Sequence, residues 1–158
     1  MNLDAYMGIR EEVVATFYDC VIVDTQSDPD STTVPSTEKQ KDLSQILASK
    51  LLTLGLNDVS SDDKGFVYAT LESNLADNKR DHVPTIGFLA HMDTSPDASG
   101  TDVKPRLHEN YDGSVITLEN GVVLDPKIDD SLADYVGDSI ITSDGTTLLG
   151  ADDKAGIA

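Results

Sequence analysis

The sequence lacks tryptophan, holds a single cysteine and is poor in basic residues. Its 11 lysines and arginines stand against 29 aspartates and glutamates, so the formal net charge is −18 with histidine counted neutral. Proteins that bind nucleic acid or anionic lipid do so with clusters of lysine and arginine, and the sequence contains no such cluster. The charge balance therefore excludes most nucleic-acid-binding functions, and we expect no nucleic acid partner.

Long apolar runs are also missing. The longest ones, such as residues 85–90, are far shorter than the roughly 18–20 residues that a membrane-spanning helix needs, so we expect no membrane partner. The N-terminus carries Asp4 and lacks the basic start and apolar region of a secretory signal. Cys20 cannot form an intramolecular disulfide and has apolar neighbours, which favours a buried thiol in a reducing compartment. We therefore expect a cytoplasmic protein.

Apolar residues recur at helical spacing in two stretches. The first stripe predicts a helix over residues 3–21. The second predicts a helix that begins with a capping box formed by Thr37 and Gln40 and ends at Gly55. Both helices should pack their apolar face on another layer.

Short β-prone runs follow the second helix. Residues 85–90 are apolar on both faces, which is typical of a central strand covered by helices on each side. Shorter strands are predicted within residues 66–71, 114–118, 122–124 and 139–143. The sequence thus predicts an α/β fold with a mainly parallel central sheet flanked by helices, in which Thr85–Ala90 is the most buried strand.

Two polar residues follow this predicted central strand directly. His91 and Asp93 are two apart on extended backbone, so they project to the same side, about 6.5–7 Å from each other along the chain. Ligands gather at the carboxyl ends of strands in such sheets, and a metal-bound imidazole commonly donates its second N–H to a carboxylate. The pair is a candidate metal site, and a solvated polar rim is the alternative interpretation. His82 and His108 are expected to be solvated.

A second acidic motif lies at the end of the chain. Asp152 and Asp153 follow Gly150 and precede a predicted helix start. One interpretation is helix capping, because an aspartate accepts backbone N–H bonds at a helix N-terminus. The other is that one of the two carboxylates bridges two metal ions. Because a helix of fewer than about three turns is marginal, we expect residues 1–158 to be the amino-terminal portion of a longer domain.

The two motifs together resemble the metal-site motifs of a known family, the co-catalytic zinc peptidases that include aminoacylases and carboxypeptidases. The resemblance lies in residues 91–97 and 149–158. It is close for the aminopeptidases of this family that act on tripeptides, and it then extends from about residue 13 to the end of the chain. The further segments that carry it are Val23–Ser27, Val34–Glu38, Ile86–Phe88, Glu109–Tyr111 and Thr142–Gly150.

The resemblance implies a role for each candidate residue. It makes His91 a ligand of one zinc ion, Asp152 the carboxylate that bridges two zinc ions, and Asp93 the catalytic-site acid that orients His91. It also implies a cis peptide bond between Asp152 and Asp153. The family's glutamate pair, a further acid and a distal histidine have no matching residues here, and the resemblance places them beyond residue 158 with the smaller lid domain.

The implied function is hydrolysis of a small peptide substrate. A water activated by two zinc ions would release the N-terminal residue of a tripeptide, and we expect residues 1–158 alone to be inactive. A related dipeptidase or a deacylase of N-acyl amino acids remains an alternative, since the two motifs build metal sites rather than specificity pockets. A non-catalytic acidic module, or a degenerate homologue, is the alternative from a different class.

Overall fold

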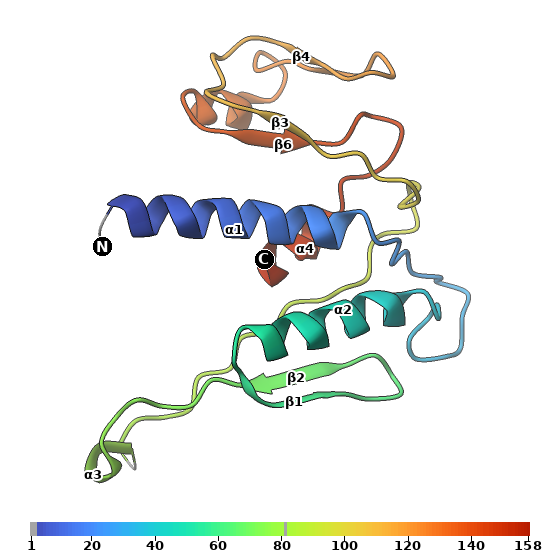
Figure 1. Cartoon of the computed structure of the whole chain (residues 1–158). Coiled ribbons are helices and arrows are strands. Elements are labelled where there is room, and N and C mark those ends of the chain that lie inside the picture. The colour runs from blue at the N-terminus through green and yellow to red at the C-terminus, as the bar shows by residue number, and fades with distance from the viewer. Residues whose placement is uncertain (1–2, 81) are drawn as a thin grey trace.

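The computed structural model describes every residue except 1, 2 and 81. Helix α1 crosses the middle of the molecule, with α2 and the β1–β2 hairpin on one side and the β3–β6 and β4–β5 pairs on the other (Figure 1). In chain order the elements are α1 (Leu3–Val21), α2 (Gln40–Thr53), β1 (Asn57–Ser61), β2 (Val67–Thr70), α3 (Asp77–Arg80), β3 (Arg106–His108), β4 (Ile116–Thr117), β5 (Val123–Leu124), the 3-10 helix η1 (Asp130–Tyr135), β6 (Ile140–Thr142) and α4 (Ala151–Ile157).

Helix α1 has the bounds that its apolar spacing predicts. Its C-terminal half buries Phe17, Cys20 and Val21, and two of these, Phe17 and Val21, pack against Val103 in one of the hydrophobic clusters. The burial of Cys20 confirms the predicted buried thiol, and desolvation raises the pKa of that thiol. Helix α4 lies beside this half of α1 (Figure 1), so the core of the molecule forms next to the end of the chain.

Helix α2 begins later than the predicted capping box. Thr37 donates its hydroxyl to the Gln26 carbonyl at 2.8 Å and accepts from the Gln40 side chain at 3.1 Å. The hydroxyl is therefore used in these contacts, and no side chain caps the helix, whose first residue is Gln40. The predicted end is confirmed, because Gly55 follows the helix with φ +81°, a conformation that glycine adopts without steric penalty. One face of α2 packs on β1 and β2.

The described sheets are small and antiparallel. Each of the three has two strands, in the pairs β1–β2, β3–β6 and β4–β5. Within the described residues, parallel pairing is limited to one bridge between Gln26 and Thr94. The mixed α/β character and four of the short predicted strands are confirmed, whereas the mainly parallel central sheet is not found in this structure.

The prediction that Thr85–Ala90 is the most buried strand is wrong for this structure. The segment belongs to no strand, and Ile86, Phe88 and Leu89 are 72%, 94% and 95% exposed. It lies in the arm whose tip is α3 (Figure 1). A run that is apolar on both faces becomes a central strand only where neighbouring strands and covering layers surround it. The described part of the chain supplies neither.

Among the described residues, no helix is long and apolar enough to cross a membrane.

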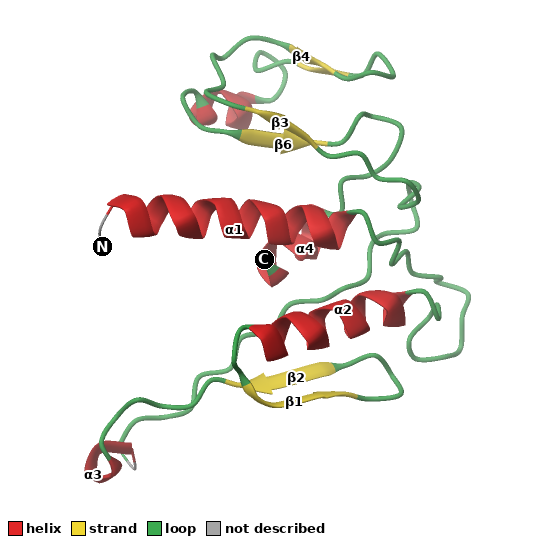
Figure 2. Ribbon diagram, viewed as in Figure 1, coloured by secondary structure: helices red, strands yellow, loops and turns green. Residues whose placement is uncertain are grey.

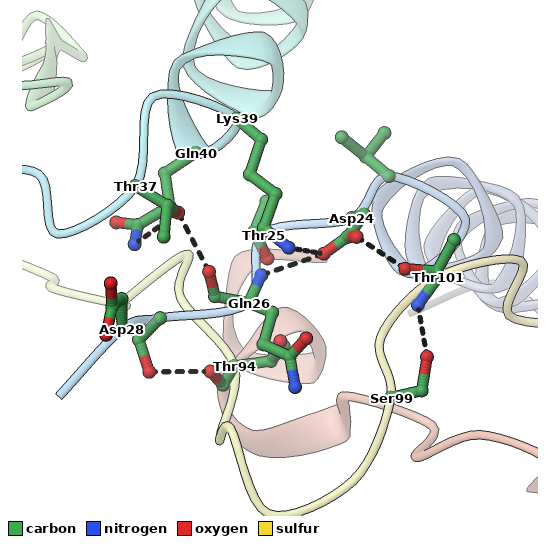
Figure 3. Close-up of polar contacts among 12 residues, drawn as sticks. Asp24, Thr25, Gln26, Asp28, Thr37, Lys39, Gln40, Thr94, Ser99 and Thr101 are labelled. Carbon is green, nitrogen blue, oxygen red and sulfur yellow. Dashed lines mark hydrogen bonds and ion pairs between the residues drawn. The ribbon is translucent and has the colours of Figure 1, made fainter. Parts of the chain in front are cut away.

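A polar network fixes the segment after α1, Val23–Ser27, which we call the connector. Within it, Asp24 Oδ1 accepts from the Gln26 backbone N–H at 3.0 Å and pairs with Lys39 at 2.9 Å, and its Oδ2 accepts from the Thr101 hydroxyl at 2.7 Å (Figure 3). Partial burial alone would raise the pKa of Asp24, but these donors outweigh it and lower that pKa. The network thus ties the end of α1 to the start of α2 and to the loop near Thr101.

The exposure of residues 85–90 predicts rapid amide exchange. In the described structure their amide groups donate no backbone hydrogen bond, and exchange is slow only where such bonds must open. We expect the amides of 86–90 to exchange much faster than those of 17–21 in α1, measured by hydrogen–deuterium exchange of the chain. Comparable protection of the two segments would contradict the described structure.

The lowered pKa of Asp24 predicts how stability changes in acid. A carboxyl whose folded pKa lies below its ordinary value of 3.8 stabilises the fold above that value, and the contribution is lost as the pH falls through the folded pKa. Asp24→Asn should therefore lower the free energy of unfolding by about 1–2 kcal/mol at pH 7 and by less at pH 3, measured by urea unfolding. Asp63→Asn, at an exposed position, serves as the control. An equal loss at both pH values for Asp24→Asn would contradict this explanation.

Candidate functional site

His91 and Asp152 meet, although 61 residues separate them in sequence. The ring nitrogen Nε2 of His91 lies 3.0 Å from Oδ1 of Asp152. The Asp152 side chain is 95% exposed and that of His91 is 53% exposed, so this contact lies at the surface. The structure thus brings together the two residues that were predicted to bind zinc.

Asp93 lies at the other nitrogen of the same ring. Nδ1 of His91 is 3.2 Å from Oδ1 of Asp93 and 3.2 Å from the Asp93 carbonyl oxygen. When Nδ1 carries the proton it donates to Asp93, and the lone pair of Nε2 is then directed to the Asp152 side. This is the orientation that a metal-binding histidine requires. The predicted proximity of His91 and Asp93 is confirmed, while the catalytic role of Asp93 stays a prediction.

The two carboxylates also favour the charged form of the ring. Partial burial alone would lower the pKa of His91, but the hydrogen bond with Asp152 and the negative charge of Asp93 outweigh it and raise that pKa. A cation placed between the ring and Asp152 would take over the role of the imidazolium proton. The two carboxylates therefore favour a positive charge at this site, either on the His91 ring or on a bound cation.

Asp152 and Asp153, the two adjacent acids at the start of α4, make different contacts. The peptide bond between Asp152 and Asp153 is cis, as the resemblance implied, and neither residue has helical backbone angles. The Asp153 carboxylate lies over Gly156, where an added Cβ would clash with its Oδ1. The capping alternative is not found, since Gly150 is the N-cap residue and no side chain caps α4. Of the two acids, Asp152 is the one that contacts His91.

Gly150 allows the two motif segments to approach each other. It has φ +78°, and an added Cβ would lie 3.2 Å from Cγ2 of Thr94. Thr94, which follows Asp93, is buried. A side chain at position 150 would be strained by its backbone conformation and crowded by this methyl group. The glycine therefore lets the backbone before Asp152 rest directly on the segment that carries His91 and Asp93.

Sequence analysis missed two residues beside the site, Thr25 and Lys154. The Thr25 hydroxyl donates to the Met92 carbonyl at 2.6 Å, and the Lys154 ammonium donates to the Val23 carbonyl at 2.7 Å. Lys154 is 2% exposed, and burial lowers its pKa to about 8. A lysine that directly follows the acidic pair at a helix start was a usable signal. Thr25 lies in a segment that carries the family resemblance, but nothing in the sequence indicated its partner, which is 67 residues away.

The remaining histidines lie apart from these residues. His82 is exposed, as expected. His108 was expected to be solvated, but it is half-buried, because its Nε2 lies 3.0 Å from the Thr142 hydroxyl across the β3–β6 pair. It lines an open cavity of about 440 Å³ whose lining includes neither His91 nor Asp152.

The donors present fit part of a zinc site. His91 supplies a nitrogen and Asp152 a carboxylate oxygen, both common zinc ligands, and two ligands of one tetrahedral ion lie about 3.3 Å apart, close to the 3.0 Å observed. Among the residues that the structure describes, no group of three or more histidine, cysteine, aspartate or glutamate side chains is placed to hold a metal ion. A complete site therefore needs ligands from elsewhere.

Comparison with known proteins gives one consistent result. No protein-family model matches the chain. The chain is 50% identical over 152 residues to peptidase T of Geobacillus thermodenitrificans, 51% identical over 150 residues to that of Alkaliphilus oremlandii and 53% identical over 150 residues to that of Shouchella clausii. These matches cover 94–95% of this chain and 36% of each relative. The chain is thus similar to peptidase T over nearly its whole length and spans about a third of the length of these curated relatives.

The incomplete donor set predicts weak zinc binding by the chain. Two ligands without the rest of a tetrahedral shell hold the ion poorly, so we expect a Kd of roughly micromolar or weaker. His91→Ala should weaken it further, and His82→Ala, at an exposed histidine, should not. Isothermal titration calorimetry measures both. Stoichiometric binding at nanomolar strength that His91→Ala abolishes would contradict the prediction.

Proposed function

We propose that this chain contributes to the two-zinc centre of an aminopeptidase of the peptidase T type, which releases the N-terminal residue of tripeptides. The observation that supports the proposal most directly is the contact between His91 and Asp152, with Asp93 on the opposite side of the ring. It occurs in a chain that is about half identical to proteins named peptidase T. Because the chain spans 36% of those relatives, the activity is proposed for a protein that includes further ligands.

Each of the three residues has a separate task in this proposal. His91 would bind one zinc ion through Nε2, and Asp152 would bridge both ions. Asp93 would accept a hydrogen bond from the Nδ1–H group of His91, which sets the ring orientation and raises the electron density on Nε2. Two zinc ions, when bound, lower the pKa of a shared water and polarise the scissile carbonyl.

The geometry favours an enzyme over a non-catalytic acidic module. His91 has one carboxylate at each ring nitrogen, and these two carboxylates come from segments far apart in the sequence. A solvated polar rim would not require this arrangement. The substrate class is less constrained, since neither of the two cavities found among the described residues is lined by His91 or Asp152, and neither therefore indicates a preference for a peptide over an N-acyl amino acid. A dipeptidase or deacylase therefore remains the second candidate.

The buried Cys20 supports the cytoplasm as the compartment. A mainly parallel sheet remains part of the proposal for a longer protein, in which residues 85–90 would be paired.

A chimaera tests the activity. This chain would replace the matching 36% of peptidase T from Geobacillus thermodenitrificans, which supplies the remaining length. We expect the chimaera to release the N-terminal residue from tripeptides, to lose activity with a chelator and to recover it with zinc. Dipeptides and N-acetyl amino acids serve as competing substrates. A folded chimaera with bound zinc that cleaves an N-acetyl amino acid in preference to a tripeptide would favour the second candidate.

The same chimaera tests the residue roles. Asp152→Asn should lose zinc as well as activity, because it removes a charge shared by two cations. Asp93→Asn should keep most of its zinc and lose about 10–100-fold in activity, which is the usual effect of removing a partner that orients a ligand. Asp153→Asn is the matched control and should keep both ions, measured by elemental analysis. Loss of zinc from Asp153→Asn, with zinc retained in Asp152→Asn, would overturn the assignment.

A further inference from the structure

Regular helix or strand geometry does not fix the position of either proposed ligand. His91 belongs to no helix or strand, and the chain that leads into β3 runs as loop (Figure 2). Asp152 lies where the backbone of α4 is not yet helical, with φ −91° and ψ 101°. A loop holds a metal ligand in one place only when other contacts fix its backbone. The contacts that do so here converge on the connector, Val23–Ser27.

The connector fixes the backbone next to His91 through Thr25 and Ser27. Thr25 is fully buried; its hydroxyl donates to the Met92 carbonyl at 2.6 Å and its carbonyl accepts from the Thr94 N–H at 3.2 Å. These two bonds hold the residues on either side of Asp93. The Thr94 carbonyl then accepts from both the backbone N–H and the hydroxyl of Ser27, each at 2.9 Å.

The connector also fixes the backbone next to Asp152, through Lys154. The Lys154 side chain is 2% exposed, and its ammonium donates to the Val23 carbonyl at 2.7 Å. A buried ammonium is retained only where it is hydrogen-bonded, so this bond draws the first turn of α4 onto the end of α1. The side chain passes Gly150, where an added Cβ would lie 3.7 Å from its Cδ.

The connector is itself held in place by its other residues. Asp24 contacts Lys39 and Thr101, and the Gln26 side chain donates to the Ala98 carbonyl at 2.9 Å. The Gln26 side chain also donates to the Ser95 carbonyl at 3.4 Å. The connector therefore contacts the two motif segments through Val23, Thr25, Gln26 and Ser27, and it contacts the surrounding structure through Asp24 and Gln26. A movement of the connector would displace His91 and Asp152 together.

We propose that the connector is the element that positions the metal site, with Thr25 as the positioning residue for His91 and Lys154 as the positioning residue for Asp152. The inference rests on the ligands of the function proposed above and adds two residues to that site. Neither residue touches the metal or the substrate. Each acts through the backbone that carries a ligand, and the spacing between Nε2 of His91 and Oδ1 of Asp152 depends on both.

Matched variants of the chain separate this role from simple packing. Thr25→Val removes the hydroxyl donor and keeps the shape of the side chain, while Thr25→Ser keeps the donor. Lys154→Met removes the ammonium and keeps the unbranched chain. Lys127→Met makes the same change at an exposed lysine.

Zinc affinity and stability, measured on the same variants by calorimetry and urea unfolding, give the first test. Methionine keeps the unbranched apolar part of the lysine side chain, so a lysine with only a packing role would leave zinc affinity unchanged. We expect Thr25→Val and Lys154→Met to raise the zinc Kd by about 10-fold, the lower end of the range for groups that orient metal ligands, without a matching loss of stability. Thr25→Ser and Lys127→Met should bind zinc like the unchanged chain.

The ring ¹⁵N resonances of His91, recorded without metal, give the second test. Asp152→Asn provides the reference spectrum for a ring without its carboxylate partner. We expect Thr25→Val and Lys154→Met to shift the His91 resonances toward that reference, and Lys127→Met to leave them in place. Unchanged resonances in both variants, or a reference identical to the unchanged chain, would overturn the inference. If His91→Ala leaves zinc binding unchanged while the expected resonance shifts are observed, the proposed metal site is refuted and the positioning role of Thr25 and Lys154 is retained.

Discussion

The hydrogen bonds of the connector are the constraint on which the rest of the site depends. Thr25 binds the backbone on both sides of Asp93, and Lys154 binds the connector two residues earlier, at Val23. These bonds join segments that are more than 60 residues apart in sequence. The Thr25 and Lys154 side chains that donate them are buried, so water competes little for these bonds. The surface-exposed contact between His91 and Asp152 is therefore supported by a layer of protected bonds beneath it.

Local patterns allowed much of the fold to be predicted. Helix α1 and the end of α2 follow from apolar spacing and from a glycine, which are properties of the segment itself. The segment 85–90 shows the limit of this reasoning, because its two-sided apolar pattern describes an environment that the described residues do not provide. The capping box failed for a similar reason, since the Thr37 hydroxyl is occupied by Gln26 from another part of the chain.

The site could be predicted where residue type and sequence spacing alone indicate a role. The spacing of His91 and Asp93 on extended backbone indicated their shared side, and the resemblance indicated which acid of the later pair faces them. The hydrogen-bond partners of the supporting residues were not predictable in this way. The hydroxyl of Thr25 and the ammonium of Lys154 act through distant carbonyl groups, and a carbonyl group is present at every residue, so the sequence carries no mark of the partner.

The most direct test of the account is an NMR measurement of scalar coupling across the hydrogen bonds between the connector and the His91 segment. The coupling would be recorded between the Ser27 amide nitrogen and the Thr94 carbonyl carbon, and between the Thr94 amide nitrogen and the Thr25 carbonyl carbon. The account predicts a detectable coupling for both pairs in the metal-free chain. The absence of both couplings, with rapid exchange of both amides, would show that the connector does not hold the site.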